Sequence, residues 1–413
     1  MRFPFPVSRF ETLSWPADPT VPGGRSERRS FRYQAFVPDP IAALQLSIPS
    51  SVAASVSAAE RAVDALNRDP PRLASLEVLA RRLLRSESVA SSRIEGLVLS
   101  QRRLARAEAE EDAARNETAR SVLGNVAAME EAVALGTGAI PLRLKDVLAI
   151  HRTLMLATTT PQIAGELRTG QNWIGGNTFN PGRAVFVPPP PRRVRALMDD
   201  LVVFMNRTDL SPVVQAAIAH AQFETVHPFA DGNGRVGRTL IHVVLRRRGL
   251  APRYVPPVSL VLAADARAYV SGLTAYRDGR SAVWIELFAR AIGRAAETAT
   301  NLAARLAELQ AAWRVRSGKP RRHSSVEALI VALPAHPILT VATGQKLLGR
   351  SKQAVNEAIA VLAESGVLRP LTLARRNRAW EARELFDLVD DVERELATPG
   401  DEAPSRPSPR PRS

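Results

Sequence analysis

The sequence predicts a mainly α-helical protein with one β-hairpin near its centre and a small helical module with a two-stranded wing toward its C-terminal end. Apolar residues recur at helical spacing through most of the chain from Ser51 onward. A stretch rich in Gly, Asn and Pro interrupts the helices at 165–187, and three short helical patterns with a basic hairpin follow residue 325. With 413 residues, the chain is long enough for two or three domains.

The composition excludes several classes of protein. Hydrophobic residues make up 45% and charged residues 23% of the chain, and there is no cysteine. Disulfides, thiol nucleophiles and Cys-ligated zinc are therefore excluded. The net charge of +15 makes nucleic acid a candidate partner, but the arginines are spread along the whole chain, which a general Arg bias also explains. We find neither a secretory-type apolar segment nor about 18 consecutive apolar residues, so we expect a cytoplasmic protein without a membrane partner.

Changes in composition along the chain predict its domain organisation. Both ends are rich in Pro, Ser and Arg and are expected to be mobile, whereas the long helical patterns between them are expected to form a core. The predicted units are a mobile segment at 1–30, an N-terminal helical region at 31–118, a catalytic core at 119–298, a helix end and linker at 299–324, a helical module at 325–397 and a disordered tail at 398–413.

The C-terminal module has the pattern of a winged helix-turn-helix domain. Its second and third helices are predicted at 340–349 and 351–366, and its wing at 367–382 carries Arg375, Arg376 and Arg378. These arginines are able to reach phosphates, as in a DNA-binding domain. The third helix lacks a dense basic face, so DNA and protein are both open as partners.

The segment most informative about chemistry is HPFADGNGRVGR, from His227 to Arg238. It follows one apolar helix and begins the next, so it is predicted to form a loop at a helix N-terminus. Such a terminus binds anions, because its first N–H groups lack partners within the helix. Gly232 and Gly234 allow the backbone to approach phosphate oxygens, and Asn233 supplies an amide donor.

The other polar residues of this segment suit nucleotidyl transfer. Arg235 and Arg238 are three residues apart and are placed to bind the β- and γ-phosphates of a nucleotide. Asp231 offers a hard oxygen ligand for Mg²⁺, which takes only one or two protein carboxylates. His227 is neutral near pH 7 and is therefore a candidate base for an incoming hydroxyl group.

This segment resembles the signature of the Fic family, HPFx[D/E]GN[G/K]RxxR, and matches it at every specified position. The resemblance implies a helical Fic fold that transfers AMP from ATP to a Tyr, Ser or Thr hydroxyl of a target protein docked at a flap, here 165–187. It also implies roles for individual residues. His227 is the base, Asp231 holds Mg²⁺, and Gly232, Asn233, Gly234, Arg235 and Arg238 bind the nucleotide.

An upstream segment resembles the inhibitory helix, [S/T]xxxE[G/N], that some Fic proteins carry before the core. It contains Ser91, Glu95 and Gly96 and is predicted as a helix at about 88–96. Ser91 and Glu95 are four residues apart and share one helical face. The resemblance implies that Glu95 pairs with Arg238 and occupies the guanidinium group that the γ-phosphate needs.

Alternatives to protein AMP transfer stay open at this point. Relatives of the Fic family phosphorylate their targets, transfer other phosphate-containing groups or remove AMP. Gly234 favours AMP transfer, because a phosphorylating relative carries Lys there. A different class of function is a DNA-binding regulator whose core only senses a nucleotide, and a homo-oligomer is also open.

Overall fold

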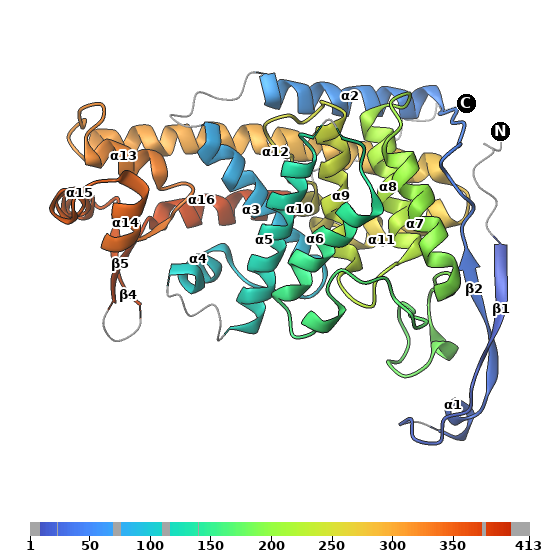
Figure 1. Cartoon of the computed structure of the whole chain (residues 1–413). Helices are drawn as coiled ribbons and strands as arrows, with labels where there is room; N and C mark the ends of the chain where they lie inside the picture. Colours follow the sequence, from blue (N-terminus) through green and yellow to red (C-terminus); the bar gives the residue numbers. More distant parts are fainter. Residues whose placement is uncertain are drawn as a thin grey trace, which may run out of the picture.

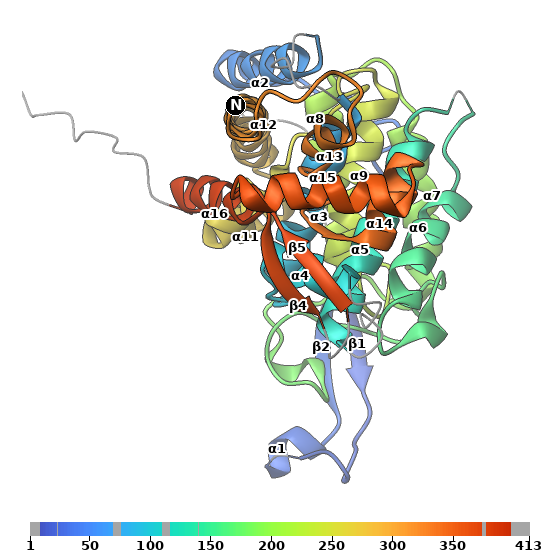
Figure 2. The ribbon, with the colours of Figure 1, turned by 90° about the vertical axis from the view of Figure 1, so that its left-hand side faces the viewer.

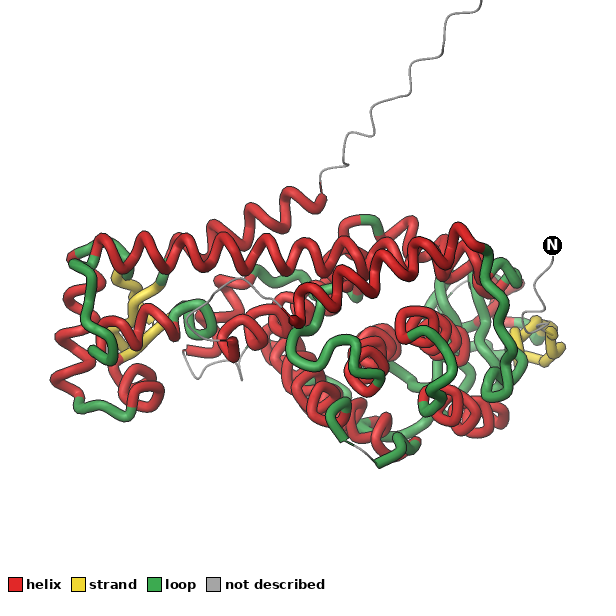
Figure 3. The backbone as a smooth tube through the Cα atoms, turned by 90° about the horizontal axis from the view of Figure 1, so that it is seen from above, coloured by secondary structure: helices red, strands yellow, loops and turns green. Residues whose placement is uncertain are grey.

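The computed structural model describes residues 9–22, 24–68, 76–109, 116–138, 140–373 and 377–397. Helices dominate this part of the chain (Figure 1), which confirms the predicted mainly α fold class. The helix α12 (Ser281–Arg316) is 36 residues long, or about 54 Å at ~1.5 Å per residue. It packs along α2 (Ser50–Arg68) and continues from the central bundle to the C-terminal module (Figure 3). Within the described residues, no helix is long and apolar enough to cross a membrane.

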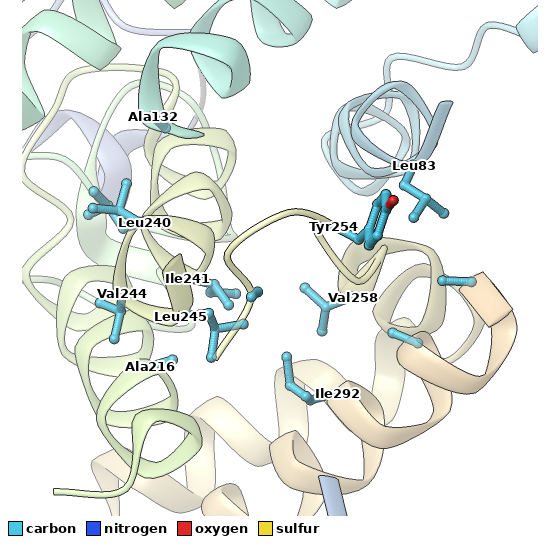
Figure 4. Close-up of a cluster of buried hydrophobic side chains, with 14 of the residues drawn as sticks. Leu83, Ala132, Ala216, Leu240, Ile241, Val244, Leu245, Tyr254, Val258 and Ile292 are labelled. Atoms are coloured by element: carbon cyan, nitrogen blue, oxygen red, sulfur yellow. The ribbon is translucent and has the colours of Figure 1, made fainter. Parts of the chain in front are cut away.

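The centre of the bundle is α8 (Pro212–Val226), which is buried on almost every side. Its sequence is apolar all round, as expected for a helix that other helices surround. Side chains of α9 (Asn233–Arg247), such as Leu240 and Val244, form the adjacent core (Figure 4). The other helices of this region are α3 (Leu76–Ile94), α4 (Gln101–Ala109), α5 (Glu117–Leu135), α6 (Leu144–Leu156), α7 (Pro191–Met205), α10 (Val258–Ala264) and α11 (Ala266–Arg277).

The N-terminal segment differs from the prediction of a mobile end at 1–30. Residues 1–8 lie outside the described part, but β1 (Arg9–Trp15) pairs antiparallel with β2 (Phe31–Val37), and the short helix α1 (Arg25–Arg28) lies between them. The pairing joins residues 16 to 28 positions apart, so local composition gives no sign of it. This hairpin projects from the bundle beside the flap (Figure 1).

The flap at 165–187 is less regular than the predicted β-hairpin. Its two sides meet at a single antiparallel bridge between Ile174 and Phe186. Gly175 and Gly176 have φ values of +75° and +78°, which bend the chain away from an extended ladder. The return side contains a short 3-10 turn, Pro181–Arg183, and the flap then contacts β2, where Phe36 N–H donates to the Val187 carbonyl at 2.9 Å.

The C-terminal module begins after a linker at 317–324 and has the order helix, strand, helix, helix, strand, strand, helix. Figure 2 shows its two longer strands side by side. Of the predicted wing arginines, Arg375 and Arg376 lie outside the described residues, as does the predicted tail at 398–413. The elements are α13 (Ser325–Ala332), β3 (Ile338–Thr340), α14 (Val341–Leu348), α15 (Lys352–Glu364), β4 (Arg369–Leu373), β5 (Asn377–Glu381) and α16 (Arg383–Ala397), with sheet order β3-β5-β4.

Candidate active site at the start of α9

A short loop between α8 and α9 carries the residues from His227 to Gly232. His227 terminates α8 in the left-handed region, with φ 50° and ψ 61°, and its N–H donates to the Phe223 carbonyl at 2.8 Å. Gly232 precedes α9 and is also left-handed, with φ 79°. These two residues turn the chain sharply, so the backbone reverses direction and α9 begins directly beside the end of α8.

The Asn233 side chain closes this loop. Its amide donates to the Phe229 carbonyl, its oxygen accepts from the Phe229 N–H, and both distances are 2.8 Å. One amide N–H and the oxygen of this side chain are therefore engaged within the loop, and donation to phosphate by the second N–H stays a prediction. Phe229 is fully buried and stacks on the His151 ring with centroids 3.7 Å apart, which anchors the loop in the core.

Arg168, at the base of the flap, holds the other side of the loop. Its Nε donates to the His227 carbonyl at 2.8 Å, and its Nη1 and Nη2 donate to the carbonyls of Gly170 and Pro189. Its own N–H donates to the Pro228 carbonyl at 2.9 Å. The buried Arg168 side chain therefore joins the flap to the 227–232 loop, and Asn172 of the flap adds a hydrogen bond to the Phe229 carbonyl at 3.0 Å.

The first turn of α9 leaves its backbone open to a ligand because it carries glycine. A Cβ atom at Gly234 would lie 2.0 Å from Oε1 of Glu95 and 2.9 Å from Nη1 of Arg238. A Cβ at Gly232 would meet the sulfur of Met155 at 2.9 Å. A side chain at residue 234 would therefore collide with Glu95 and Arg238, and one at residue 232 would collide with the core below the loop.

Arg235 and Arg238 are both buried and both have partners from the N-terminal helices. Arg235 is 4% exposed, and its Nη1 donates to Oγ of Ser121 on α5 at 2.9 Å. Arg238 is 1% exposed, and its Nε and Nη2 donate to the hydroxyl and carbonyl oxygens of Ser91 on α3 at 2.9 and 2.8 Å.

Glu95 lies just beyond the end of α3 and, together with Ser91, provides the hydrogen-bond acceptors for Arg238. Its Oε1 accepts from Nη2 of Arg238 at 2.8 Å. Burial alone would raise the pKa of Glu95, but the nearby Arg238 and Arg235 charges outweigh burial and lower this pKa below its ordinary value. The carboxylate is thus ionised and paired. Gly96 follows with φ +80°, a left-handed conformation that ends the helix.

The His227 ring is neutral in its surroundings. Burial, and then the positive charge of Arg168, lower the pKa of His227 to about 4. Nδ1 is buried without a hydrogen-bond partner among the described residues, while 19% of the side chain is exposed. The exposed part of the ring therefore lies on its other atoms, which include Nε2. A neutral imidazole with one accessible nitrogen is able to accept a proton.

Asp231 is the carboxylate of the loop nearest to α9. Its side chain is 59% exposed, and Oδ1 lies 3.9 Å from Nη2 of Arg235. No group of three or more His, Cys, Asp or Glu side chains in the described ranges is arranged to hold a metal ion. One exposed carboxylate still fits Mg²⁺, which in nucleotide sites takes most of its ligands from phosphates and water.

A cavity of about 590 Å³ opens between the flap and the loop. Its walls come mainly from flap residues, including Arg168, Asn172 and Trp173, with Ala230 on the loop side. This volume falls in the range of small-ligand pockets. The cavity therefore lies along the flap and reaches the 227–232 loop at Ala230, beside the start of α9.

Two family models match the part of the chain that forms this site. The Fic/DOC family model matches residues 141–245, and the model for the Fic/DOC family N-terminal region matches residues 53–134. Residues 141–245 of this chain are therefore a Fic/DOC domain. This domain contains the flap and the 227–238 motif, and the matched N-terminal region contains Glu95.

Similar proteins with curated names come from animals. "Protein adenylyltransferase Fic" of Drosophila virilis is 35% identical over 138 residues, which are 33% of this chain and 26% of that protein. "Protein adenylyltransferase fic-1" of Caenorhabditis elegans is 34% identical over 131 residues, which are 31% of this chain and 23% of that protein. The matches thus span about a quarter of the length of these relatives. A crystal structure of a Fic family protein from Desulfovibrio desulfuricans G20 is 23% identical, with a TM-score of 0.49 over 81% of this chain and 97% of that one.

The predicted residues from His227 to Arg238 lie in the loop and the first turns of α9, and Ser91 and Glu95 contact Arg238. Residues that the sequence analysis did not single out also belong to this site: Arg168, Ser121 and Glu224. Arg168 and Glu224 lie close to the motif or the flap in sequence, yet a single Arg or Glu carries no periodic signal. Their roles depend on contacts that only the folded chain makes.

Proposed function

We propose that this protein is a Mg²⁺-dependent protein adenylyltransferase, which transfers AMP from ATP to a Tyr, Ser or Thr hydroxyl of a target protein. The observation that carries the proposal is the meeting of three features at one helix start. These are the neutral His227 ring, the glycine-rich first turn of α9, and the buried Arg235 and Arg238. The names of the relatives in Drosophila and Caenorhabditis support the same activity.

The reaction follows from this arrangement. His227 takes the proton of the target hydroxyl while its oxygen forms a bond to the α-phosphorus. The bond from this phosphorus to the bridging oxygen breaks, and pyrophosphate leaves with the electron pair. Backbone N–H groups at Gly232 to Gly234 and the two guanidinium groups stabilise the negative charge of the phosphates. Asp231 would hold Mg²⁺, which neutralises phosphate charge when bound.

In the proposed inhibited state, Glu95 restrains this reaction. Its carboxylate occupies the Nη2 atom of Arg238, which is therefore not available for a γ-phosphate. The position of Gly234 adds a steric element, because Glu95 reaches within 2.0 Å of the point where a Cβ at residue 234 would lie. A carboxylate this close to the helix start competes with phosphate oxygens for the same space.

The target protein is proposed to dock at the flap. The flap has only one bridge, between Ile174 and Phe186, and forms no continuous ladder of its own, so we expect an extended target segment to pair with its edge. Such pairing uses backbone hydrogen bonds of the target and does not select its side chains. It is therefore compatible with Tyr, Ser or Thr as the modified residue. We propose that this reaction takes place in the cytoplasm. A homo-oligomeric state of the protein is a further proposal.

The C-terminal module is proposed to be a winged helix that binds DNA. Its element order and the sheet order β3-β5-β4 support the winged-helix fold, and DNA is the proposed partner. Retention of the full chain on duplex DNA at low salt, lost as salt rises, is the expected result. Absence of retention at low salt would exclude DNA as the partner.

The decisive experiment for the main proposal is mass spectrometry of a lysate incubated with ATP, Mg²⁺ and the Glu95→Gly protein. We expect peptides that gain the mass of an AMP group on a hydroxyl side chain. A gain of a single phosphate would indicate another donor reaction, and loss of AMP from a pre-modified target would indicate the reverse activity. The His227→Ala protein under the same conditions is the control.

A further inference from the structure

A buried carboxylate lies beside the proposed base. Glu224 is on the last turn of α8, three residues before His227, and its side chain is 12% exposed. Its Oε2 lies 4.0 Å from Nδ1 of His227. Oε1 of Glu224 and Nδ1 of His227 are both buried without a hydrogen-bond partner among the described residues. Two unpartnered polar atoms on adjacent buried side chains are uncommon, and they call for an explanation.

Gly237 on α9 provides the space that this carboxylate occupies. A Cβ atom at residue 237 would lie 2.3 Å from Oε1 of Glu224 and 2.9 Å from Cδ1 of Phe223. Any larger residue there would therefore displace the carboxylate. Position 237 is not specified by the HPFx[D/E]GN[G/K]RxxR pattern, and position 224 lies outside it. The pair Glu224 and Gly237 is thus a feature of this chain in addition to the motif.

The surroundings of His227 disfavour a positive charge on its ring. Burial acts first, followed by the charge of Arg168, and Arg277 on α11 acts in the same direction; the backbone of Glu224 and the charge of Glu95 act in the opposite direction but do not outweigh them. A general base must nevertheless hold a proton for part of the reaction, and it works best when its proton affinity is near the working pH. A negative partner is therefore needed. Glu95 is one such neighbour, but it leaves the site when the proposed inhibition is released.

We propose that Glu224 is a positioning residue that acts through His227, as the counter-charge for its ring when the ring takes the proton of the target hydroxyl. This inference rests on the proposed function. The proton moves from the hydroxyl to Nε2, while the new oxygen–phosphorus bond forms and pyrophosphate leaves with the electrons of the broken bond. The resulting imidazolium faces the Glu224 carboxylate through Nδ1–H. The arrangement is that of a base oriented and stabilised by a second buried group.

The charge of Glu224 depends on the groups around it. Burial raises the pKa of Glu224 to about 7, Arg238 and Arg277 lower it, and Glu95 raises it. Tyr269 on α11 also faces this carboxyl group. Departure of Glu95 therefore favours the ionised form of Glu224. When Glu95 leaves the site, Glu224 therefore becomes more readily ionised and is able to act as the counter-charge for His227.

The test compares full-length Glu95→Gly protein with the same protein carrying Glu224→Gln. The His227 ring is followed by NMR of ¹³C- and ¹⁵N-labelled histidine over a pH range, with its signal assigned by its loss in His227→Ala. We expect Glu224→Gln to lower the pKa of His227 further while the Nδ1–H tautomer is kept. We also expect the kcat for AMP transfer to fall about tenfold or more, with the KM for ATP within about twofold.

Two further variants keep the test decisive. Gly237→Ala retains the carboxylate but displaces it, so it should change the titration of His227 in the same direction; it replaces Glu224→Gln if that protein does not fold. Glu87→Gln removes a fully buried carboxylate that lies 3.0 Å from His242, farther along α9, and it should leave the His227 titration unchanged.

Three results would overturn the inference. The first is an unchanged His227 titration in Glu224→Gln and Gly237→Ala, and the second is an unchanged kcat. The third is a change confined to the KM for ATP, which would indicate a structural role. If no variant transfers AMP at all, the proposed function fails, while the NMR titration still decides whether Glu224 supports the charge on His227.

Discussion

Oε1 of Glu95 accepts a hydrogen bond at 2.8 Å from Nη2 of Arg238, although 143 residues separate the two in sequence. The same guanidinium group is held by the hydroxyl and carbonyl oxygens of Ser91. Arg238 is therefore surrounded by acceptors from the end of α3, and the state of that helix end decides whether the arginine is free for a phosphate.

Replacement of Glu95 by Gly should raise auto-AMPylation with labelled ATP. A charge-assisted hydrogen bond contributes about 1.5–3 kcal/mol, and because Glu95 is 38% exposed we expect the lower end, or about tenfold in rate. Glu95→Gln should give a smaller increase, since the amide keeps the shape but loses the charge. Labelling no greater than that of the wild type would contradict inhibition by Glu95.

Replacement of His227 should abolish AMP transfer and leave ATP binding in place. We expect a loss of at least about 100-fold, the usual contribution of a general base. His227 has φ 50°, a conformation that Asn tolerates better than Ala, so His227→Asn tests the chemistry with less strain on the loop. ATP binding by both variants is measured by calorimetry. If both variants transferred AMP at the rate of the wild type, His227 would be excluded as the base.

Arg168 should be important for the stability of the loop. Its side chain satisfies the buried carbonyl oxygens of His227, Gly170 and Pro189, and Arg168→Met would leave them without this donor. We expect a loss of about 3 kcal/mol in unfolding free energy, seen as a fall of several degrees in Tm. Arg168→Lys keeps the positive charge but loses the planar guanidinium group. Its Tm should therefore lie between that of the wild type and that of Arg168→Met. Equal Tm values for all three proteins would contradict this role.

Glu224 should make stability depend on pH. Its pKa is about 7 in the folded protein and near 4.3 in an unfolded chain, so between these values the folded state holds a proton that the unfolded state releases. Stability should therefore fall, by on the order of 3 kcal/mol, as pH rises from about 4 to above 7. Denaturant unfolding of wild type and Glu224→Gln at pH 5 and pH 8 isolates this effect. The Gln protein should gain stability over the wild type mainly at pH 8; an equal difference at both pH values would reject the raised pKa.

The C-terminal module should influence the inhibitory helix. Glu393 on α16 accepts from Nη2 of Arg93 at 2.6 Å, two residues before Glu95, and Leu396 packs with Ala90 on α3. Glu393→Gln is expected to loosen this end of α3 and to raise basal auto-AMPylation, by less than Glu95→Gly does. The matched control is Glu395→Gln on the same helix, because Glu395 pairs with Arg305 of α12 instead. Identical labelling by the two proteins would contradict the coupling.

Patterns within one or two helical turns allowed much of this protein to be predicted. The spacing of HPFADGNGRVGR indicated a loop followed by a helix start, and the structure has His227 and Gly232 in left-handed conformations with α9 beginning at Asn233. The separation of Ser91 and Glu95 likewise indicated one shared face, and both contact Arg238. Such predictions succeed because helical geometry and glycine conformation are local properties.

Predictions that depended on pairing between distant segments were less successful. The β1–β2 hairpin was missed because its two strands have a 15-residue connection and no tight turn signal. The flap was expected to be a regular hairpin, whereas the structure has one bridge between Ile174 and Phe186, since its glycines and Pro181 interrupt the ladder.

The sequence by itself determined the family, the order of the helices and the residue types gathered at the start of α9. Only the tertiary structure decided which partners the side chains of these residues contact. Arg235 is bound to Ser121, Arg238 to Glu95, the Asn233 side chain to its own loop, and Glu224 faces His227. The physical reason is that burial and charge pairing depend on which helices pack together, and this packing is the sum of many apolar contacts that no short motif encodes.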